Sequence, residues 1–255
     1  MKLGSQEKFN LRYRDRAIYT ELKALPPLIV RADGRNFKRL IGDSFEKPYD
    51  ERFAKGMAEA ATIFFERSGF DPKLAYTFSD EINLFFTHVP FNGRIEKLDS
   101  VIAGFLASAL AIALDFREAI AFDARVIPIC SKEDVCEYLA LRQAEAWRNC
   151  INAYGFYGLR AAGLSGEEAE QHLEGMKAME VHDLLFQKGI NLNEIPTWQK
   201  RGILIAREEY EKEGYDPRAG KNVTVTRYKV VQLWDLPLFG SEDGRKLLAQ
   251  LIEGL

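Results

Sequence analysis

Short apolar runs alternate with longer amphipathic segments through the first half of the chain. The run from Leu28 to Val30 follows two prolines and is rich in β-branched residues, which predicts a buried strand. The segment from Leu74 to Phe86 has apolar and aromatic residues on both sides of a short polar centre, which predicts a strand, a tight turn and a second strand. A further strand is predicted from Ala119 to Ile129.

Two amphipathic helices are predicted between these strands, from Pro48 to Gly69 and from Arg94 to Phe116. In the first of them the apolar residues recur with a helical period of roughly 3.6 residues. They are Phe53, Met57, Ala60, Ala61 and Phe64. The resulting order is β-α-β-β-α-β, the split βαβ arrangement. The sequence therefore predicts an α+β fold in which residues 1–129 form a ferredoxin-like palm, an antiparallel sheet with two helices on one face.

The second half of the chain, residues 130–255, is predicted to contain further helices and a hairpin. The helices are expected at Ser131–Ala162, at Ser165–Lys188 in one or two pieces, and at Ser241–Ile252. The hairpin is expected to pair Arg201–Arg207 with Val223–Trp234 through a long polar connection. Because no Pro/Gly/Ser-rich linker separates the two halves, we expect the C-terminal region to pack on the palm.

The composition is that of an ordinary globular protein, with 255 residues of which 47% are hydrophobic and 29% charged. The formal net charge of −3 excludes a whole-protein basic field, so RNA would bind at local patches or across an oligomer. Three cysteines and three scattered histidines fit neither a disulfide framework nor a zinc site, which favours a cytoplasmic protein. The N-terminus lacks the apolar core of a signal peptide, and the uncharged stretch Val101–Leu114 is too short to span a membrane.

Candidate chemistry lies where the predicted strands end. Asp33 and Gly34 follow the first strand, and a carboxylate followed by glycine suits a metal or phosphate site, although the same dipeptide is common in plain turns. Ser79, Asp80 and Glu81 occupy the predicted hairpin tip, where a solvated turn is the alternative. If both strand ends converge on one edge of the sheet, Asp33 and Asp80 would share a pair of divalent ions, as phosphoryl transfer requires.

Four motifs, in this order, are ADGRNFKRL, FEKPYD, TFSDE and FDAR. Together they resemble the tRNA-histidine guanylyltransferase family and its guanylyltransferase-like relatives, which extend RNA in the 3′-to-5′ direction. The matching motifs lie between about Arg31 and Arg207 and cover most of the chain. The family has the palm fold that nucleic-acid polymerases and nucleotide cyclases share, in agreement with the predicted order of strands and helices.

The resemblance implies that Asp33 and Asp80 bind two Mg²⁺ ions, with the Gly34 carbonyl as a further ligand and Glu81 as a third acidic partner in catalysis. ATP, GTP or another nucleoside triphosphate would be held by Ser79, Asp80 and the loop that consists of Asp33, Gly34, Arg35, Asn36, Phe37 and Lys38. Lys47 and Lys97 match basic positions of the family, and Lys47 would neutralise a transferring phosphate. An ordinary surface position is the alternative for each lysine. The Phe37 ring would stack on a base, and core packing is the alternative for it.

One departure separates this chain from the eukaryotic members, which carry a HINNLYN motif on the helix after the palm. In the corresponding stretch Asn152 and Tyr154 match, but Asn149 replaces the histidine. The sequence is therefore more similar to the archaeal and bacterial branch, for which templated nucleotide addition and repair of tRNA 5′ ends are expected. Strict addition of one guanosine to tRNA-histidine is the alternative.

The family reaction has two steps. ATP adenylylates the 5′-monophosphate of a tRNA, and the 3′-hydroxyl of the incoming nucleotide then displaces AMP. A nucleotide cyclase or a 5′-to-3′ polymerase would use the same palm and carboxylates, and a non-catalytic RNA-binding protein could keep the fold alone. The presence of Asp33, Asp80 and Glu81 disfavours the last of these.

Basic residues for tRNA gather in three groups, which are Arg12, Arg14 and Arg16; Arg142 and Arg148; and Lys200, Arg201 and Arg207. We expect weak tRNA contacts from the last group and from Asn149 and Asn152. Because a tRNA is longer than one subunit is wide, and because family members form multimers, a homo-oligomer, in particular a tetramer, is expected.

Overall fold

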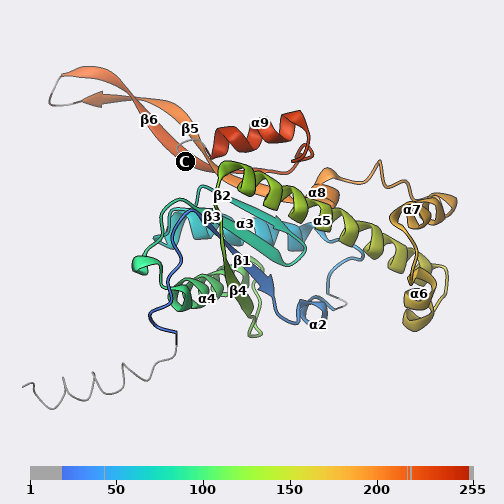
Figure 1. Cartoon of the computed structure of the whole chain (residues 1–255). Coiled ribbons are helices and arrows are strands. Elements are labelled where there is room, and N and C mark those ends of the chain that lie inside the picture. Colours follow the sequence, from blue (N-terminus) through green and yellow to red (C-terminus); the bar gives the residue numbers. More distant parts are fainter. Residues whose placement is uncertain (1–18, 43, 217, 219, 253–255) are drawn as a thin grey trace, which may run out of the picture.

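A six-stranded antiparallel sheet with the strand order β4-β1-β3-β2-β5-β6 forms the centre of the molecule (Figure 1). The computed structural model describes residues 19–252, except 43, 217 and 219. The strands are β1 (Leu28–Gly34), β2 (Leu74–Phe78), β3 (Glu81–Phe86), β4 (Phe122–Pro128), β5 (Ile203–Asp216) and β6 (Lys221–Leu233). The predicted palm is confirmed, with β1, β3 and β2 side by side in its sheet.

The helices cover both faces of this sheet and extend beyond it. They are α2 (Phe37–Ile41), α3 (Glu51–Arg67), α4 (Ile95–Ala113), α5 (Lys132–Ala161), α6 (Gly166–Leu173), α7 (Ala178–Gln187), α8 (Thr197–Arg201) and α9 (Glu242–Leu251), with a 3-10 turn, η1, at Phe91–Gly93. The side chain of Ser131 caps α5 by accepting a hydrogen bond from the Asp134 amide, as expected for a helix start. Within the described part of the chain, the helices are too short or too polar to cross a membrane.

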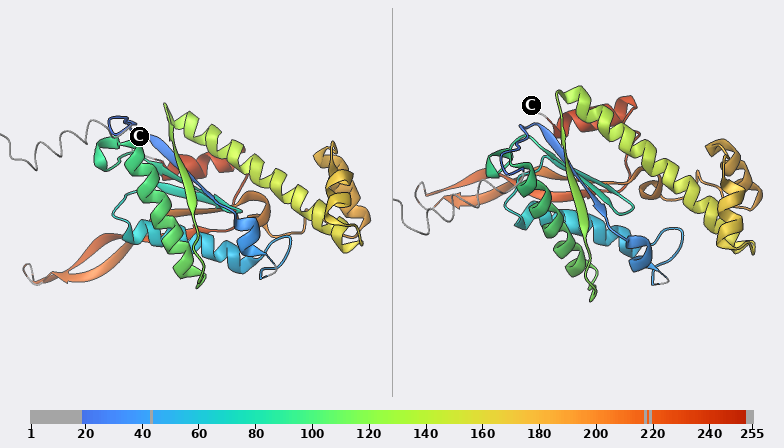
Figure 2. Two further views of the ribbon diagram at one scale, coloured as in Figure 1. Left: turned by 90° about the horizontal axis from the view of Figure 1, so that it is seen from below. Right: turned by 60° about the horizontal axis from the view of Figure 1, so that its bottom comes forward.

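Successive side chains of β1 enter two different cores. Leu28 and Val30 pack in the core that also contains side chains of α3 and α4, whereas Ile29 packs on the opposite face with side chains of α5 and α9. Helices therefore cover both faces of the sheet (Figure 2), which explains why β1 begins with three successive apolar residues, Leu28–Val30. The two palm helices share one face as predicted, and the C-terminal region covers the other.

The C-terminal region packs on the palm as expected, and it also shares the sheet of the palm. β5 pairs with β2 from Ile203 to Ala206, so the palm sheet continues directly into the C-terminal hairpin. The division of the chain at residues 129 and 130 stays a prediction. At the far end of α5, Trp147 and Tyr154 pack with side chains of α7 in a smaller core, in agreement with a structural role for both aromatic residues.

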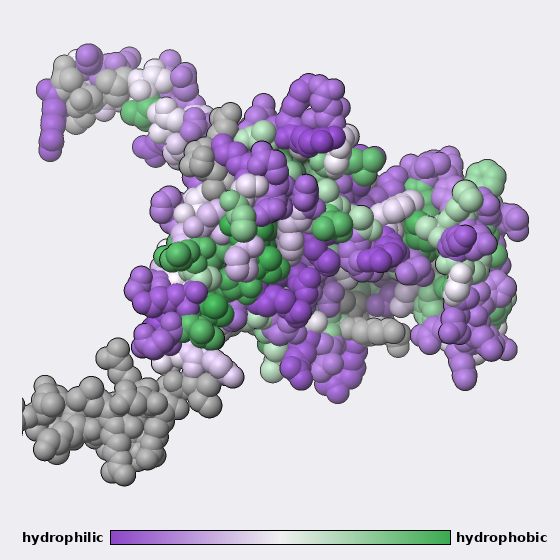
Figure 3. All heavy atoms as spheres, viewed as in Figure 1, coloured by the Kyte–Doolittle hydropathy of each residue, from purple (hydrophilic) through white to green (hydrophobic). Residues whose placement is uncertain are grey.

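β5 is longer than the sequence predicted, whereas β6 agrees with the predicted strand Val223–Trp234 to within two residues at each end. Their ladder runs from the pair Leu204–Leu233 to the pair Asp216–Lys221, so the expected polar connection is mostly strand. Beyond Ala206 the two strands form a ribbon that projects from the body (Figure 1) and is mostly hydrophilic on the face seen in Figure 3. Beyond Ala206, β5 is exposed and mostly charged, so this part lacks the apolar alternation by which a strand is recognised in a sequence.

Candidate active site

The end of β1 and the turn between β2 and β3 meet at one edge of the sheet. Asp33 lies directly across the β1–β3 ladder from Glu81, and the Gly34 amide donates a hydrogen bond to the Asp80 carbonyl with an N–O distance of 2.9 Å. The predicted convergence of the two strand ends is therefore present in the fold. It follows from the antiparallel register, which sets the C-terminal end of β1 beside the hairpin tip.

Gly34 is required at this junction because the two backbones approach closely. A Cβ atom built on Gly34 would lie 1.7 Å from the nearest ring carbon of Phe37 and 2.9 Å from the Cβ atom of Asp80. The ring of Phe37 is buried in the core and has little room to move away. Glycine therefore lets Asp33 and Asp80 come together.

Asp33 is held by two arginines from neighbouring positions of the sheet. The Nε atom of Arg31 lies 3.1 Å and the Nη2 atom of Arg125 3.3 Å from its Oδ2 atom. Among the side chains that the structure describes, Asp80 has no such cation in contact; its Oδ1 atom accepts a hydrogen bond of 3.1 Å from the Ser79 hydroxyl. Burial and, to a smaller extent, the negative charge of Asp33 raise the pKa of the Asp80 carboxyl.

The donor set at this edge fits Mg²⁺. Two carboxylates and a backbone carbonyl are oxygen donors of the kind that hard divalent cations prefer. The raised pKa of Asp80 indicates that its carboxylate lacks compensating positive charge, which a bound cation would supply. Asp33, Asp80 and the Gly34 carbonyl are therefore the residues that would hold the ions.

Glu81 lies beside these aspartates but its carboxylate is already engaged. Arg142 of α5 contacts both of its oxygens, with Nε–Oε1 and Nη2–Oε2 distances of 2.8 and 2.5 Å, and the Asn83 amide donates to Oε1 at 2.7 Å. In the described residues no three or more His, Cys, Asp or Glu side chains converge as a metal-binding group would. The structure thus places the expected third acidic partner in a buried ion pair.

The loop after Asp33 contains both exposed and buried side chains. Arg35 and Asn36 are exposed beside the site, and Asn36 has a positive φ of 60° at the turn into α2. Phe37 is 1% exposed and packs edge-to-face against Phe53 and Phe122, so core packing accounts for it and base stacking does not. The Lys38 side chain lies outside the described residues.

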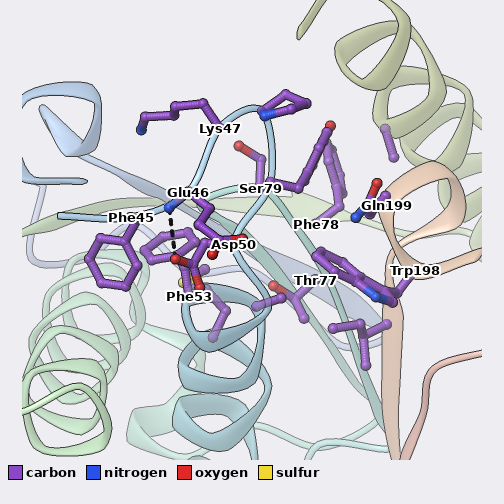
Figure 4. A pocket seen from close by; sticks show the side chains of 16 residues that line it. Phe45, Glu46, Lys47, Asp50, Phe53, Thr77, Phe78, Ser79, Trp198 and Gln199 are labelled. Atoms are coloured by element: carbon purple, nitrogen blue, oxygen red, sulfur yellow. Dashed lines mark hydrogen bonds between the residues drawn. The ribbon is translucent and has the colours of Figure 1, made fainter. Parts of the chain in front are cut away.

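A cavity of about 110 Å³ opens next to the hairpin tip, between the Phe45–Asp50 loop and α8 (Figure 4). Lys47 and Ser79, two of the expected nucleotide contacts, both line it, and both side chains are exposed. Most of the other walls are apolar or aromatic, including Phe78 and Trp198. A small, mostly apolar cavity with a few polar groups beside two carboxylates suits the base of a nucleotide.

Sequence reasoning missed several residues of this cavity. Asp50 lines it while capping α3, and its hydrogen bonds from Arg52 lower the pKa of its carboxyl to about 2. Gln199 reaches the cavity from α8 and accepts a hydrogen bond of 2.6 Å from the Tyr154 hydroxyl. These side chains come from segments far apart in the sequence, and only the acidic start of α3 gave a local signal.

Lys97 is not brought to this site. It is exposed on the first turn of α4, after the end of β3 that lies opposite the hairpin tip. The six residues of β3 separate the two ends by roughly 17 Å. The backbone of Arg94, at the start of α4, forms an isolated β-bridge with that of Lys23, which precedes β1. This contact agrees with a position of Lys97 at the far end of the sheet.

The basic residues expected to hold tRNA mostly hold other parts of the protein. Lys200 donates to the carbonyls of Leu192 and Asn193, and Arg201 donates to the Leu236 carbonyl at 2.7 Å. Arg207 pairs with Asp71 and lies over the Phe65 ring, while Arg142 is bound to Glu81 and Arg148 pairs with Glu145. The group Arg12, Arg14 and Arg16 lies outside the described residues.

Two asparagines of α5 complete the expected tRNA contacts. Asn149 is half-buried and Asn152 is exposed, both on the part of α5 that extends toward α6. Asn152 lines a groove together with Glu167, Glu170 and Glu174. Because this groove is acidic, its charge opposes contact with RNA phosphates.

Comparison with known proteins agrees with this architecture over nearly the whole chain. A family model described as tRNAHis guanylyltransferase matches residues 12–130, and a Thg1 C terminal domain matches residues 133–232. A probable tRNA(His) guanylyltransferase of Homo sapiens is 32% identical over 218 residues, which cover 78% of this chain and 73% of the relative.

Solved structures give the same result for the fold. The crystal structure of tRNA(His) guanylyltransferase from Saccharomyces cerevisiae, 26% identical, superposes with a TM-score of 0.66 and covers 76% of this chain and 90% of its own. A bacterial tRNA(His) guanylyltransferase (Thg1)-like protein in complex with ATP, 24% identical, has a TM-score of 0.72 and covers 97% and 99%. The chain therefore belongs to the tRNA(His) guanylyltransferase family, whose members are nucleotidyltransferases.

Proposed function

We propose that this protein adds a guanosine nucleotide to the 5′ end of tRNA(His). The observation that carries the proposal is the junction of Gly34 with Asp80, which sets two carboxylates at the hairpin tip, next to a cavity that suits the base of a nucleotide. The curated relatives named as tRNA(His) guanylyltransferases support this substrate better than they support general tRNA repair, the interpretation first drawn from the sequence. Bacterial proteins of this type bind ATP and GTP, which supports these nucleotides as substrates.

The residues of the site have distinct tasks in this reaction. The aromatic cavity holds the base, while Ser79 and the amides of the loop after Gly34 hold the phosphates at the hairpin tip. Lys47, on the rim of the cavity, neutralises charge on the transferring phosphate (Figure 4). Asp33 and Asp80 would hold two Mg²⁺ ions, which would supply the remaining positive charge.

Two displacements at phosphorus make up the reaction. The 5′-phosphate of the tRNA attacks the α-phosphate of ATP and expels pyrophosphate. The 3′-hydroxyl of GTP then attacks the activated 5′-phosphate and expels AMP. Positioning and charge neutralisation suffice for both steps, so one pair of carboxylates can serve both. Such a reaction on tRNA would take place in the cytoplasm, which is the location that the reduced cysteines favour.

The test is incubation of tRNA(His) carrying a labelled 5′-monophosphate with ATP and GTP. We expect a tRNA longer by one nucleotide, an adenylylated intermediate when GTP is omitted, and no product with Asp80→Asn. A cyclic nucleotide, extension of the 3′ end, or binding without any product would each contradict the proposal and would instead favour a cyclase, a conventional polymerase or an RNA-binding protein.

Templated addition to truncated tRNAs is a second candidate function, favoured by Asn149 in place of the histidine of eukaryotic members. The two functions differ in how the added base is chosen. We expect a tRNA that lacks its first nucleotide, offered with each base in turn at the opposing position, to distinguish them. Addition of guanosine regardless of the opposing base supports the tRNA(His) function, whereas addition of the complementary nucleotide supports the templated one.

A further inference from the structure

Among the side chains of α5 that contact the β2–β3 hairpin, Arg142 lies next to its tip. Its guanidinium forms the two hydrogen bonds to Glu81 described above, and its Cζ atom lies 5.4 Å from the centre of the Phe78 ring. Phe78 and Glu81 face each other across the β2–β3 ladder and are the last pair before the turn. Arg142 therefore contacts Phe78 and Glu81, the two residues that flank the tip formed by Ser79 and Asp80.

The side chains of Asn83 and Tyr138 support the contact between Arg142 and Glu81. The Asn83 amide donates to Glu81, and the Tyr138 hydroxyl donates to the Oδ1 atom of Asn83 at 2.7 Å. Tyr138 precedes Arg142 by one helical turn, so α5 reaches two successive positions on one face of β3. Glu81 and Asn83 are 5% and 1% exposed, and a buried, fully bonded network of this kind holds its members in one arrangement.

We propose that Arg142 is a positioning residue, which through Phe78 and Glu81 fixes the hairpin tip and so the direction in which Asp80 presents its carboxylate to a divalent cation. The consequence for catalysis rests on the proposed function, but the consequence for cation binding does not. Arginine is suited to this task because its planar fork binds a carboxylate at two points and stacks on an aromatic ring, whereas lysine offers a single ammonium.

The alternative role for Glu81, direct binding of the metal, makes the opposite prediction. If Glu81 were a ligand, Arg142 would compete with the cation for its oxygens, and a weaker hold by residue 142 would strengthen cation binding. If Arg142 positions Asp80, the same change weakens binding. The sign of the change in affinity therefore decides between the two roles.

The experiment measures Mn²⁺ binding to the nucleotide-free protein by electron paramagnetic resonance, for wild type, Arg142→Lys and Tyr138→Phe. Loss of a residue that orients a metal ligand typically weakens metal binding by about 10- to 100-fold. We expect a loss in this range for Arg142→Lys and a smaller loss for Tyr138→Phe, which removes one hydroxyl and keeps the fold. In the transfer assay kcat should fall while the KM for tRNA stays unchanged.

Two control variants lie on the same helix. Arg148→Lys makes the same substitution at an exposed position paired with Glu145. Gln143→Leu removes buried hydrogen bonds to the backbone of Arg201, Pro237 and Phe239, none of which belongs to the hairpin tip, and so destabilises the fold without removing a contact with the tip. We expect wild-type Mn²⁺ affinity from both controls.

Unchanged or tighter Mn²⁺ binding by both Arg142→Lys and Tyr138→Phe would overturn the proposal. An equal loss in Gln143→Leu would also overturn it, because the effect would then reflect general destabilisation. A wild-type protein that binds Mn²⁺ but does not extend tRNA would contradict the proposed function only, and the affinities of the variants would still test the positioning role.

Discussion

The amide of Gly34 donates a hydrogen bond to the carbonyl of Asp80, and this contact joins the end of β1 to the β2–β3 turn. The two segments are separated by α3 in the sequence, yet they meet without any intervening side chain. The absence of a Cβ atom at position 34 is therefore as important for the site as the carboxylates that it brings together.

Gly34→Ala should abolish nucleotide transfer. The added methyl group would lie well inside the contact distance of the Phe37 ring and of Asp80, so the hairpin tip must move away from Asp33. We expect a loss of stability of about 1–3 kcal/mol, as for other overpacked positions, and no detectable transfer to tRNA. Urea unfolding and the labelled tRNA assay measure the two effects.

The control for this variant is Gly104→Ala in α4, where a Cβ atom meets nothing within 4 Å. This change should raise stability by roughly 0.5–1 kcal/mol because alanine favours a helix over glycine, and it should leave transfer unchanged. Normal transfer by Gly34→Ala would show that the close approach of the two backbones is not needed.

Asp80→Asn should separate stability from activity. Burial raises the pKa of Asp80, which means that the ionised carboxylate is less favourable in the folded than in the unfolded protein. The amide removes this charge, so the variant should be at least as stable as wild type while transfer is lost.

Asp33→Asn should also lose transfer, but it leaves Arg31 and Arg125 without their shared carboxylate and should lower stability. Near-wild-type adenylylation by either variant would refute the assignment of the two aspartates.

Asp99 gives a prediction for the pH dependence of stability. It is partly buried on α4, its Oδ1 atom has no hydrogen-bond partner, and burial raises its pKa to about 6. An acid whose pKa is higher in the folded than in the unfolded protein lowers stability as the pH rises, here from about 4 to about 6, and the penalty then stays constant.

Asp99→Asn removes this penalty and should stabilise the protein at pH 8 by roughly 1–2 kcal/mol, allowing for partial exposure, with little gain at pH 4. Urea unfolding at both pH values measures the difference. Glu59→Gln, at an exposed position of α3, serves as the control and should not change with pH in this way. An equal effect of Asp99→Asn at pH 4 and pH 8 would contradict the assignment.

The sequence predicted the palm well because each of its elements has a strong local pattern. β1 begins with three successive apolar residues, and the regular apolar face of α3 is followed by a glycine, so both could be placed from a few residues. The sequence also predicts β6 as a strand, but the outer part of β5 is mostly charged, and no pattern of alternation distinguishes it from a loop.

The site could be predicted only where one strand end determines the chemistry. Asp33, Gly34 and Asp80 belong to segments with clear local signals, and the topology brings them together. The pairing of Glu81 with Arg142 depends on a helix 61 positions away in the chain, and no local pattern shows which carboxylate such a helix will contact. For the same reason the cavity residues Trp198 and Gln199 were not found, since α8 reaches the site only through the pairing of β5 with β2.

Lys97 gives a prediction about the assembly. In its own subunit it lies at the end of the sheet opposite Asp80, so it can contact a nucleotide or a tRNA at the catalytic site only if a second subunit supplies it. We propose that the enzyme is a homo-oligomer, in particular the tetramer expected from the sequence, in which one tRNA contacts more than one subunit. Lys97→Ala should then reduce transfer while leaving Mn²⁺ binding and stability unchanged.

Mixed oligomers of the Lys97→Ala and Asp80→Asn variants test this arrangement directly. Lys97→Ala and Asp80→Asn proteins are unfolded and refolded together, and transfer is compared with that of each variant refolded alone. In mixed oligomers some sites combine an intact Asp80 with an intact Lys97 from a neighbouring subunit, so activity should reappear, at up to about a quarter of the wild-type value if subunits mix at random and each site uses one neighbour. A protein that sediments as a monomer at assay concentration, or a mixture no more active than its separate components, would show that Lys97 does not act across a subunit boundary.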